Sequence, residues 1–341
     1  MRNIVFLISG QGSQYYQMGF DLYCENEIFH KKMHTLDEII RERFGFSIID
    51  VIYNQKKGVS EAFDDPVYSS LGIYLIEYAL ASTLANYGVK PAKIIGSSLG
   101  MFVASVLAQC IDEVQGLEII YSLMNNIKNR CTQGGMIAVL ADPGLYHNSH
   151  ILKNNSVLAA IDPGFSFVLS MQASSLSCVE PYLKKMNVGF QCLPVSRAYH
   201  SHHMEPIKND FLNINLTFSS KTPFISLICC AKTDELKTVQ LSDLWYAVRQ
   251  PLLFTNTITR IEDKMTSCYV DIGPSGMMAT YLKYILPKNS KSEVYTILSP
   301  YKQASKNFLQ VVDRCTTIEN NSQFTLVNPS VSGLSRVSEI R

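Results

Sequence analysis

Charged side chains are scarce in this sequence and balanced in sign. Asp, Glu, Lys and Arg make up 17% of the 341 residues, and the formal net charge is +1. This composition lacks the basic excess that is typical of nucleic-acid-binding proteins. No apolar stretch reaches the roughly 20 residues that a membrane-spanning helix needs. We therefore expect a cytoplasmic protein that binds neither nucleic acid nor membrane.

Paired cysteines and a targeting segment are also missing. The nine cysteines include no CxxC pair and no regular spacing, and several lie in apolar runs, so we expect buried reduced thiols. The N-terminal apolar run, residues 4–8, leads into Gly10-Gln11-Gly12 instead of a cleavage site. This pattern predicts a first buried strand and not a signal peptide.

The sequence does contain one G-x-S-x-G pentad, Gly96-Ser97-Ser98-Leu99-Gly100. Two β-branched residues, Ile94 and Ile95, precede it, and a long apolar stretch follows it. A strand, a sharp turn and a helix in this order form a nucleophile elbow, which exposes a serine Oγ at the tip of the turn. Backbone N–H groups at the start of the helix would then face a developing oxyanion. Such pentads also occur by chance as plain turns, but the strand and helix on either side favour the catalytic interpretation.

Apolar patterning divides the chain into two kinds of fold unit. Strand and helix signals alternate before residue 131 and after 196, which predicts a parallel sheet covered on both faces. Residues 132–195 show the order βαββαβ, which is that of a ferredoxin-like unit. We expect an α/β-hydrolase-like subdomain of residues 1–131 and 196–303 with this small subdomain inserted. Residues 304–341 are expected to form a loosely held, partly disordered C-terminal extension.

A nucleophilic serine needs a base, and seven histidines are available. His30, His34, His147 and His150 fit solvated surface positions. His200, His202 and His203 cluster where the predicted insert returns to the main domain. No carboxylate or cysteine at ligand spacing accompanies them, so we expect no metal site.

Four motifs in the same order resemble one family. Gly10-Gln11-Gly12-Ser13-Gln14 resembles its GQGSQ, and Gly96–Gly100 resembles its GHSLG. Ala198-Tyr199-His200-Ser201 with Met204 is similar to its A-F-H-S-x-x-M, and the strand ending at Gly273-Pro274 is similar to its last motif. The family comprises the malonyl-CoA:acyl-carrier-protein transacylases and the acyltransferase domains of polyketide synthases. The resemblance covers about residues 3 to 300 and implies the two-subdomain fold described above.

The resemblance also implies roles for individual residues. Ser98 would be the nucleophile and His200 its base, with an oxyanion hole formed by the backbone N–H groups of Gln11 and Leu99. The family orients this histidine with a backbone carbonyl four residues before a proline. Pro251 matches that proline and places the carbonyl at Ala247. No cofactor is implied, because the substrate arrives on the phosphopantetheine of an acyl carrier protein.

The departures from the family concern recognition of a substrate carboxylate. Malonyl-loading members carry an arginine 25 residues after the nucleophile, and this position is Leu123 here. The supporting residues also differ, so the predicted acyl pocket consists of Leu123, Ser97, Ser70, Met101 and Ile161. Arg130 lies about 10 Å further along the same helix, too far to substitute. Burying a malonyl carboxylate without a cation is costly, so malonyl is expected to be a poor substrate.

Three functions fit these observations. The first is an acyl hydrolase that removes acyl groups without a carboxylate from carrier proteins, resembling the proofreading hydrolases of polyketide systems with free-standing acyltransferases. The second is a transacylase that loads a simple or malonyl acyl unit. The third is a catalytically silent protein that only docks carrier proteins, which the retained Ser98, His200 and Gln11 argue against. We expect a monomer whose partners are the carrier-protein domains of a polyketide synthase.

Overall fold

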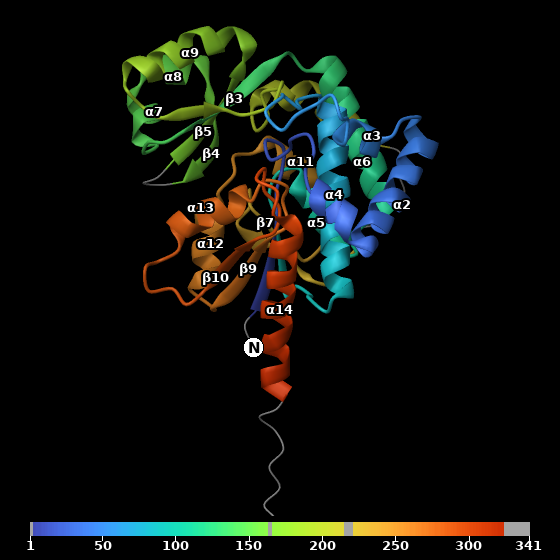
Figure 1. Cartoon of the computed structure of the whole chain (residues 1–341). Helices are drawn as coiled ribbons and strands as arrows, with labels where there is room; N and C mark the ends of the chain where they lie inside the picture. Colours follow the sequence, from blue (N-terminus) through green and yellow to red (C-terminus); the bar gives the residue numbers. More distant parts are fainter. Residues whose placement is uncertain (1–2, 163–165, 215–220, 324–341) are drawn as a thin grey trace, which may run out of the picture.

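The computed structural model describes residues 3–162, 166–214 and 221–323, with side chains described up to residue 316. Within these residues, the larger sheet has the strand order β10–β9–β1–β2–β7–β8 (Figure 1). Every neighbouring pair is parallel except β7 and β8. The strands are β1 (Asn3–Ile8), β2 (Lys93–Gly96), β7 (Ser226–Cys229), β8 (Asp234–Glu235), β9 (Ser267–Asp271) and β10 (Glu293–Thr296).

Both faces of this sheet are buried, as the continuous apolar runs predict. Along β1, Ile4, Phe6 and Ile8 belong to the larger core, while Val5 and Leu7 belong to a second core on the opposite face. This alternation follows from the two-residue period of side chains in a strand. The α/β-hydrolase-like sheet expected from the sequence is therefore confirmed.

Helices cover the two faces unequally (Figure 1). Most of them contribute to the larger core, which lies on the face of Phe6. Helices α12 and α13 cover the face of Leu7. The helices of this subdomain are α1 (Phe20–Glu25), α2 (Glu27–Phe44), α3 (Ile48–Ile52), α4 (Pro66–Asn86), α5 (Gly100–Leu107), α6 (Glu113–Arg130), the 3-10 helix η1 (His202–Ile207), α10 (Lys208–Leu212), α11 (Leu241–Arg249), α12 (Phe254–Glu262), α13 (Met277–Ile285) and α14 (Ala304–Gln323).

A separate antiparallel sheet has the order β4–β5–β3–β6. Its chain order is β3 (Gly134–Val139), α7 (Gly144–Asn148), α8 (His150–Asn155), β4 (Val157–Asp162), β5 (Ser166–Gln172), α9 (Ala173–Lys185) and β6 (Phe190–Cys192). This arrangement is the ferredoxin-like βαββαβ unit that the sequence predicts. It has its own core, in which Ile137, Phe167 and Leu183 are fully buried. The element order and strand order together confirm the fold class.

The two subdomains are joined by backbone hydrogen bonds as well as by the connecting chain. The Leu252 N–H donates to the Ala159 carbonyl at 2.8 Å, and the Ile161 N–H donates to the Leu252 carbonyl at 3.1 Å. Strand β4 of the small sheet is thus paired locally with the segment just before α12. The space between the subdomains is fixed on this side by backbone geometry.

The C-terminal region differs from the loosely held extension that we expected. Residues 304–323 form the helix α14, and Phe308, Val311 and Cys315 are buried in the larger core. The Phe308 ring packs edge-on against Tyr87, with 5.1 Å between ring centroids. Apolar residues spaced three and four positions apart drive this packing, although the polar residues around them mask the period. The remaining part of the predicted extension, residues 324–341, lies outside the described residues.

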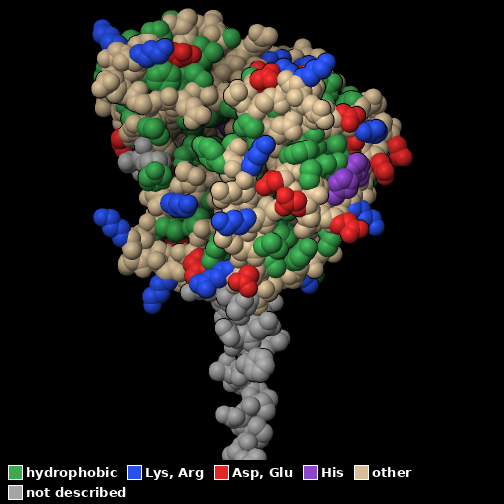
Figure 2. Space-filling view, in the orientation of Figure 1, with side chains coloured by type: hydrophobic (Ala, Val, Ile, Leu, Met, Phe, Trp, Pro, Cys, Tyr) green, Lys and Arg blue, Asp and Glu red, His purple; other side chains and the backbone are tan. Residues whose placement is uncertain are grey.

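Charge is dispersed over the surface that Figure 2 shows, where basic and acidic side chains alternate over this face. Among the described helices, none combines the length and the apolar character that crossing a bilayer requires. The described residues also contain no group of three His, Cys, Asp or Glu side chains that could bind a metal ion.

The docking of α14 predicts a specific pattern of stability. Phe308→Ala should lower the free energy of unfolding by about 3–5 kcal/mol, because it leaves a cavity beside Tyr87. Leu309→Ala is the matched control, since the neighbouring side chain is 60% exposed and its loss should change stability by less than about 0.5 kcal/mol. Urea unfolding of both variants measures the difference. Equal, small effects would show that α14 does not contribute to the core.

Candidate active site

Ser98 lies at the sharp turn between β2 and α5. Its backbone has a φ of 54°, a conformation that is rare for residues other than glycine and typical of a strained catalytic turn. The flanking glycines make the turn possible. A Cβ at Gly96 would lie 2.7 Å from the Met101 Cα, and one at Gly100 would lie 2.3 Å from the Ile8 carbonyl oxygen. Any larger residue would push the strand and the helix apart.

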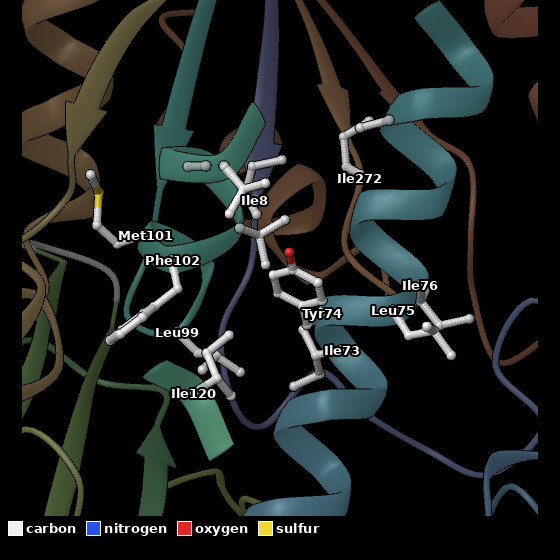
Figure 3. Close-up of a cluster of buried hydrophobic side chains, with 14 of the residues drawn as sticks. Ile8, Ile73, Tyr74, Leu75, Ile76, Leu99, Met101, Phe102, Ile120 and Ile272 are labelled. Atoms are coloured by element: carbon white, nitrogen blue, oxygen red, sulfur yellow. The ribbon is translucent and has the colours of Figure 1, made fainter. Parts of the chain in front are cut away.

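The helix behind the turn is held by apolar packing. Figure 3 shows Leu99, Met101 and Phe102 among buried side chains of α4 and α6, including Tyr74 and Ile120. All five are at most 1% exposed. The position of the elbow is therefore set by a close-packed core, which resists small displacements of Ser98.

His200 reaches Ser98 from the segment that follows the small subdomain. The two atoms, His200 Nε2 and Ser98 Oγ, are 2.9 Å apart. The backbone of His200 has a φ of 56°, and its N–H donates to the Val248 carbonyl at 3.2 Å. The structure thus brings together the two residues for which the sequence predicts catalytic roles, although 102 positions separate them.

The imidazole is oriented by a carbonyl, but not by the one that we expected. His200 Nδ1 donates to the Gln250 carbonyl at 2.7 Å, so the Ala247 prediction is wrong. Ala247 lies inside α11, which continues to Arg249. The chain leaves the helix at Gln250 with extended geometry, because the following Pro251 disfavours a helical residue before it. This turn directs the Gln250 carbonyl toward the histidine.

These contacts assign the proton positions of the dyad. A carbonyl oxygen only accepts, so Nδ1 carries the hydrogen and Nε2 has a free lone pair for the Ser98 proton. His200 is only 4% exposed, and burial lowers its pKa to about 4. The neutral, basic form therefore dominates at physiological pH. This arrangement can accept a proton from Ser98 and return it to a leaving group.

The glycine-rich loop after β1 lies directly over the elbow. A Cβ at Gly10 would be 2.8 Å from the Ser98 Cβ and 3.2 Å from the Leu99 backbone nitrogen. Gln11 follows Gly10 immediately, so its backbone borders the same space. The predicted oxyanion-hole residues Gln11 and Leu99 are thus close to Ser98, and their roles stay a prediction.

A buried acid that the sequence analysis did not single out supports this loop. Glu77 of α4 is fully buried, and its Oε1 accepts from the Ser9 N–H at 2.8 Å and from the Ser9 hydroxyl at 2.6 Å. Burial raises the pKa of Glu77 well above its ordinary value, although the Ser9 hydrogen bonds oppose this shift. Glu77 is the one charged residue of α4, and that isolation was the available signal in the sequence. Its carboxyl group fixes the start of the loop that carries Gln11.

A cavity of about 90 Å³ opens at Ser98 between the two subdomains. Ser98, His200, Ser97 and Gln11 lie at its polar end. Most of the remaining wall is apolar and comes from both subdomains. This wall comprises Met136, Ala160, Val168, Leu193, Leu252, Phe254, Met277, Met278 and Tyr281.

The cavity is not where the sequence analysis placed it. Of the five residues expected in the acyl pocket, Ser97 lines the cavity, whereas Leu123, Ser70, Met101 and Ile161 do not. Leu123, Ser70 and Met101 are at most 1% exposed and belong to packed helix interiors. Ile161 instead takes part in the pairing between the subdomains, because its backbone N–H donates to the Leu252 carbonyl.

The Gln11 side chain explains why the region near Leu123 is closed. Its Nε2 donates to the Ser70 hydroxyl and to the Pro66 carbonyl, and it approaches the Met124 sulfur at 3.7 Å. These contacts place the amide between α4 and α6. The open space lies instead beside α12 and α13, which residue-by-residue transfer from the family could not show.

The low pKa of His200 gives a pH prediction. Neutral His200 is the active form and loses its function on protonation, so kcat/KM should stay level from neutral pH down to about 5. It should then fall as the pH drops through about 4. Fixed-time assays of acyl release would measure kcat/KM across this pH range, with circular dichroism as a control for unfolding. A fall in kcat/KM with an apparent pKa near 6.5, while the fold stays intact, would contradict the buried environment of His200.

The Glu77–Ser9 contact gives a second prediction. Glu77→Ala should lower kcat by about 10- to 100-fold with a smaller effect on KM, because a displaced loop weakens oxyanion stabilisation more than ground-state binding. Glu77→Gln keeps an acceptor for Ser9 and should retain most of the activity. A purely structural role would instead lower the amount of folded enzyme, so kcat is normalised to active sites titrated by acylation. Equal loss in both variants would contradict the loop-positioning role.

Comparison with known proteins agrees with this fold. The sequence profile of the family described as "Acyl transferase domain" matches residues 5–325. The chain is 34% identical over 304 residues to the polyketide biosynthesis acyltransferase homolog PksD of Bacillus subtilis, covering 89% of this chain and 94% of that protein. It is 32% identical over 310 residues to the homolog BaeD of Bacillus velezensis, covering 91% and 96%.

Among solved structures, a loading acyltransferase from the avermectin modular polyketide synthase superposes with a TM-score of 0.83. The match covers 92% of this chain and 100% of that one, at 16% identity, and supports the fold alone. The family profile and the two Bacillus relatives extend over nearly all of the chain that carries the Ser98–His200 pair. The chain belongs to the acyl transferase domain family.

Proposed function

We propose that this protein is an acyl hydrolase that acts on acyl carrier proteins in polyketide biosynthesis. It would remove acyl groups without a carboxylate from phosphopantetheine thioesters through an acyl-enzyme on Ser98. One observation carries the proposal: the Ser98–His200 pair opens into a largely apolar cavity that no described Lys or Arg side chain lines. Such a cavity favours plain acyl chains.

Three arginines of the surrounding elements have partners outside the cavity, and one of them, Arg249, pairs with Glu205. Arg197 donates to the carbonyls of Ile127 and Lys128, and Arg130 pairs with Asp210 on the surface. A malonyl carboxylate in the cavity would lose its hydration without gaining a partner from these residues. The relatives belong to an acyltransferase family. The proposed function differs from acyl transfer in the acceptor, which is water, and it is restricted to acyl groups without a carboxylate.

The proposed reaction has two steps. His200 Nε2 takes the Ser98 proton as Oγ bonds to the thioester carbonyl carbon, and the resulting tetrahedral oxyanion faces the backbone N–H groups of Gln11 and Leu99. The carbon–sulfur bond breaks, and His200 gives its proton to the departing thiolate sulfur, which leaves as the thiol. Water then attacks the ester with His200 as base, which releases the carboxylic acid and restores the Ser98 hydroxyl.

A second hollow adjoins the first and gives the carrier arm a route to Ser98. It shares Leu193, Met277 and Tyr281 with the acyl cavity and holds about 1290 Å³ of space open to solvent. Its wall is more polar and includes Gln191 and Thr280. Amide and hydroxyl groups of this kind suit the two amides of a phosphopantetheine arm, which supports a carrier protein as the partner.

Transfer of a simple acyl group to a second carrier protein is the alternative function. Membership of the acyl transferase family favours it, because the same acyl-enzyme can react with a thiol in place of water. The two functions share Ser98, His200 and the cavity, and they differ only in the group that attacks the acyl-enzyme.

The test follows acetyl and malonyl groups from one carrier protein, with and without a second, empty carrier protein. Free acetate should form while the acceptor stays empty, and malonyl should be released at least about 100-fold more slowly. Ser98→Ala should abolish release, with Ser97→Ala as the neighbouring control that retains the nucleophile. Acetyl transfer without free acid would support the alternative, and efficient malonyl release or transfer would contradict the proposed selectivity.

A further inference from the structure

The acyl cavity contains one carboxylate among the described residues that line it. Asp162 ends strand β4 and forms part of the cavity wall, with only 5% of its surface exposed. Its neighbours in the wall include the apolar Ala160, Val168 and Phe254. An acid in such surroundings is unusual, because burial of an ionised group without partners is costly.

Three polar contacts hold the carboxylate group in place. Oδ1 accepts from the Thr255 hydroxyl at 2.8 Å and from the Thr255 N–H at 3.4 Å. Oδ2 accepts from the Ser166 hydroxyl at 3.5 Å. Thr255 lies in the first turn of α12, where the helix dipole favours a negative charge. Burial raises the pKa of Asp162, while the contacts with Thr255 and Ser166 lower it.

These contacts leave part of the carboxylate available to a substrate. Two carboxylate oxygens offer about four lone-pair directions. Among the described residues, the one hydrogen bond to Oδ2 is long. The charge also reaches other groups of the wall, because Asp162 raises the pKa of the Tyr281 hydroxyl in addition to the larger effect of burial. The negative charge therefore acts within the same enclosed space into which Ser98 opens.

We propose that Asp162 determines which acyl groups this enzyme accepts: it repels acyl chains that carry a carboxylate and binds acyl chains that carry a hydroxyl group. This inference rests on the proposed acyl hydrolase function and names the substrate class of that site as hydroxyacyl thioesters. A hydroxyl can donate to the free lone pairs of Oδ2, and hydrogen bonds to an ionised acceptor are stronger than neutral ones. Two like charges in one poorly hydrated cavity repel each other.

The same contacts also allow a purely structural role. Asp162 links the small subdomain to the first turn of α12, so its loss could disturb the cavity without any effect of charge. Thr255→Val separates the two roles, because it removes the main hydrogen bond to Asp162 while leaving the carboxylate in place. Asp162→Asn does the opposite, since it removes the charge and keeps an oxygen that can accept from Thr255.

The experiment measures kcat/KM for butyryl, 3-hydroxybutyryl and malonyl groups on one carrier protein with wild type, Asp162→Asn and Thr255→Val. Wild type should prefer 3-hydroxybutyryl to butyryl and should process malonyl most slowly. In Asp162→Asn the malonyl-to-butyryl ratio should rise about tenfold, as expected when one of two nearby charges is removed. The 3-hydroxybutyryl preference should shrink several-fold. Thr255→Val should change both ratios less than Asp162→Asn does, because the Thr255 N–H and the Ser166 hydroxyl still stabilise the ionised carboxylate.

Unchanged ratios in Asp162→Asn, or equal changes in Thr255→Val, would overturn the role of the Asp162 charge. If Asp162→Asn does not fold, the substrate preference of the wild type still tests the inference. Equal kcat/KM values for butyryl and 3-hydroxybutyryl would contradict it. Failure of butyryl itself to acylate wild-type Ser98, followed by intact mass, would instead contradict the proposed hydrolase function and the inference with it.

Discussion

The close approach of β1 and β2 at their carboxyl ends is the constraint on which this active site depends. A Cβ at Gly100 would lie only 2.3 Å from the carbonyl oxygens of Ile8 and Ser9. A Cβ at Gly10 would lie 2.8 Å from the Ser98 Cβ. Because the two turns touch without side chains between them, the position of the loop is fixed relative to that of the nucleophile. Glu77 adds a third contact, because its carboxyl group accepts hydrogen bonds from the N–H and the hydroxyl of Ser9.

Desolvation determines the protonation state of His200 and the cost of placing a charged substrate in the site. A base held by a carbonyl lacks the carboxylate that would stabilise an imidazolium, so burial keeps His200 neutral. The same dry surroundings make any unpartnered charge in the substrate costly. A site of this kind suits a thioester whose acyl group carries no carboxylate. Two charges then develop in the reaction: the oxyanion at the predicted backbone N–H groups, and the imidazolium, whose Nδ1–H faces the Gln250 carbonyl.

The sequence predicts the parts of the structure that local patterns encode. The G-x-S-x-G pentad between a strand and a helix located Ser98, and the βαββαβ order of residues 132–195 located the small sheet. His200 followed from its motif, whereas its partner carbonyl did not. The direction of a carbonyl depends on where α11 ends, which a count back from Pro251 cannot determine.

Tertiary packing decided the remaining features. Leu123 and Ser70 replace family residues of the acyl pocket, but the Gln11 side chain fills their region and the open space lies beside Phe254 and Tyr281. Asp162 and Glu77 belong to no motif, and their importance is visible only from what surrounds them. Helix α14 was missed because its few apolar residues are separated by polar ones.

The central claim is that Ser98, activated by His200, carries a simple acyl group in an apolar cavity. The most direct measurement is the intact mass of the protein, followed by peptide mapping, after brief incubation with an acetylated carrier protein and rapid acid quenching. The account predicts one acetyl group on Ser98, with none in His200→Ala within the same time. Acetylation at another residue, or an equal rate of acetylation without His200, would contradict it.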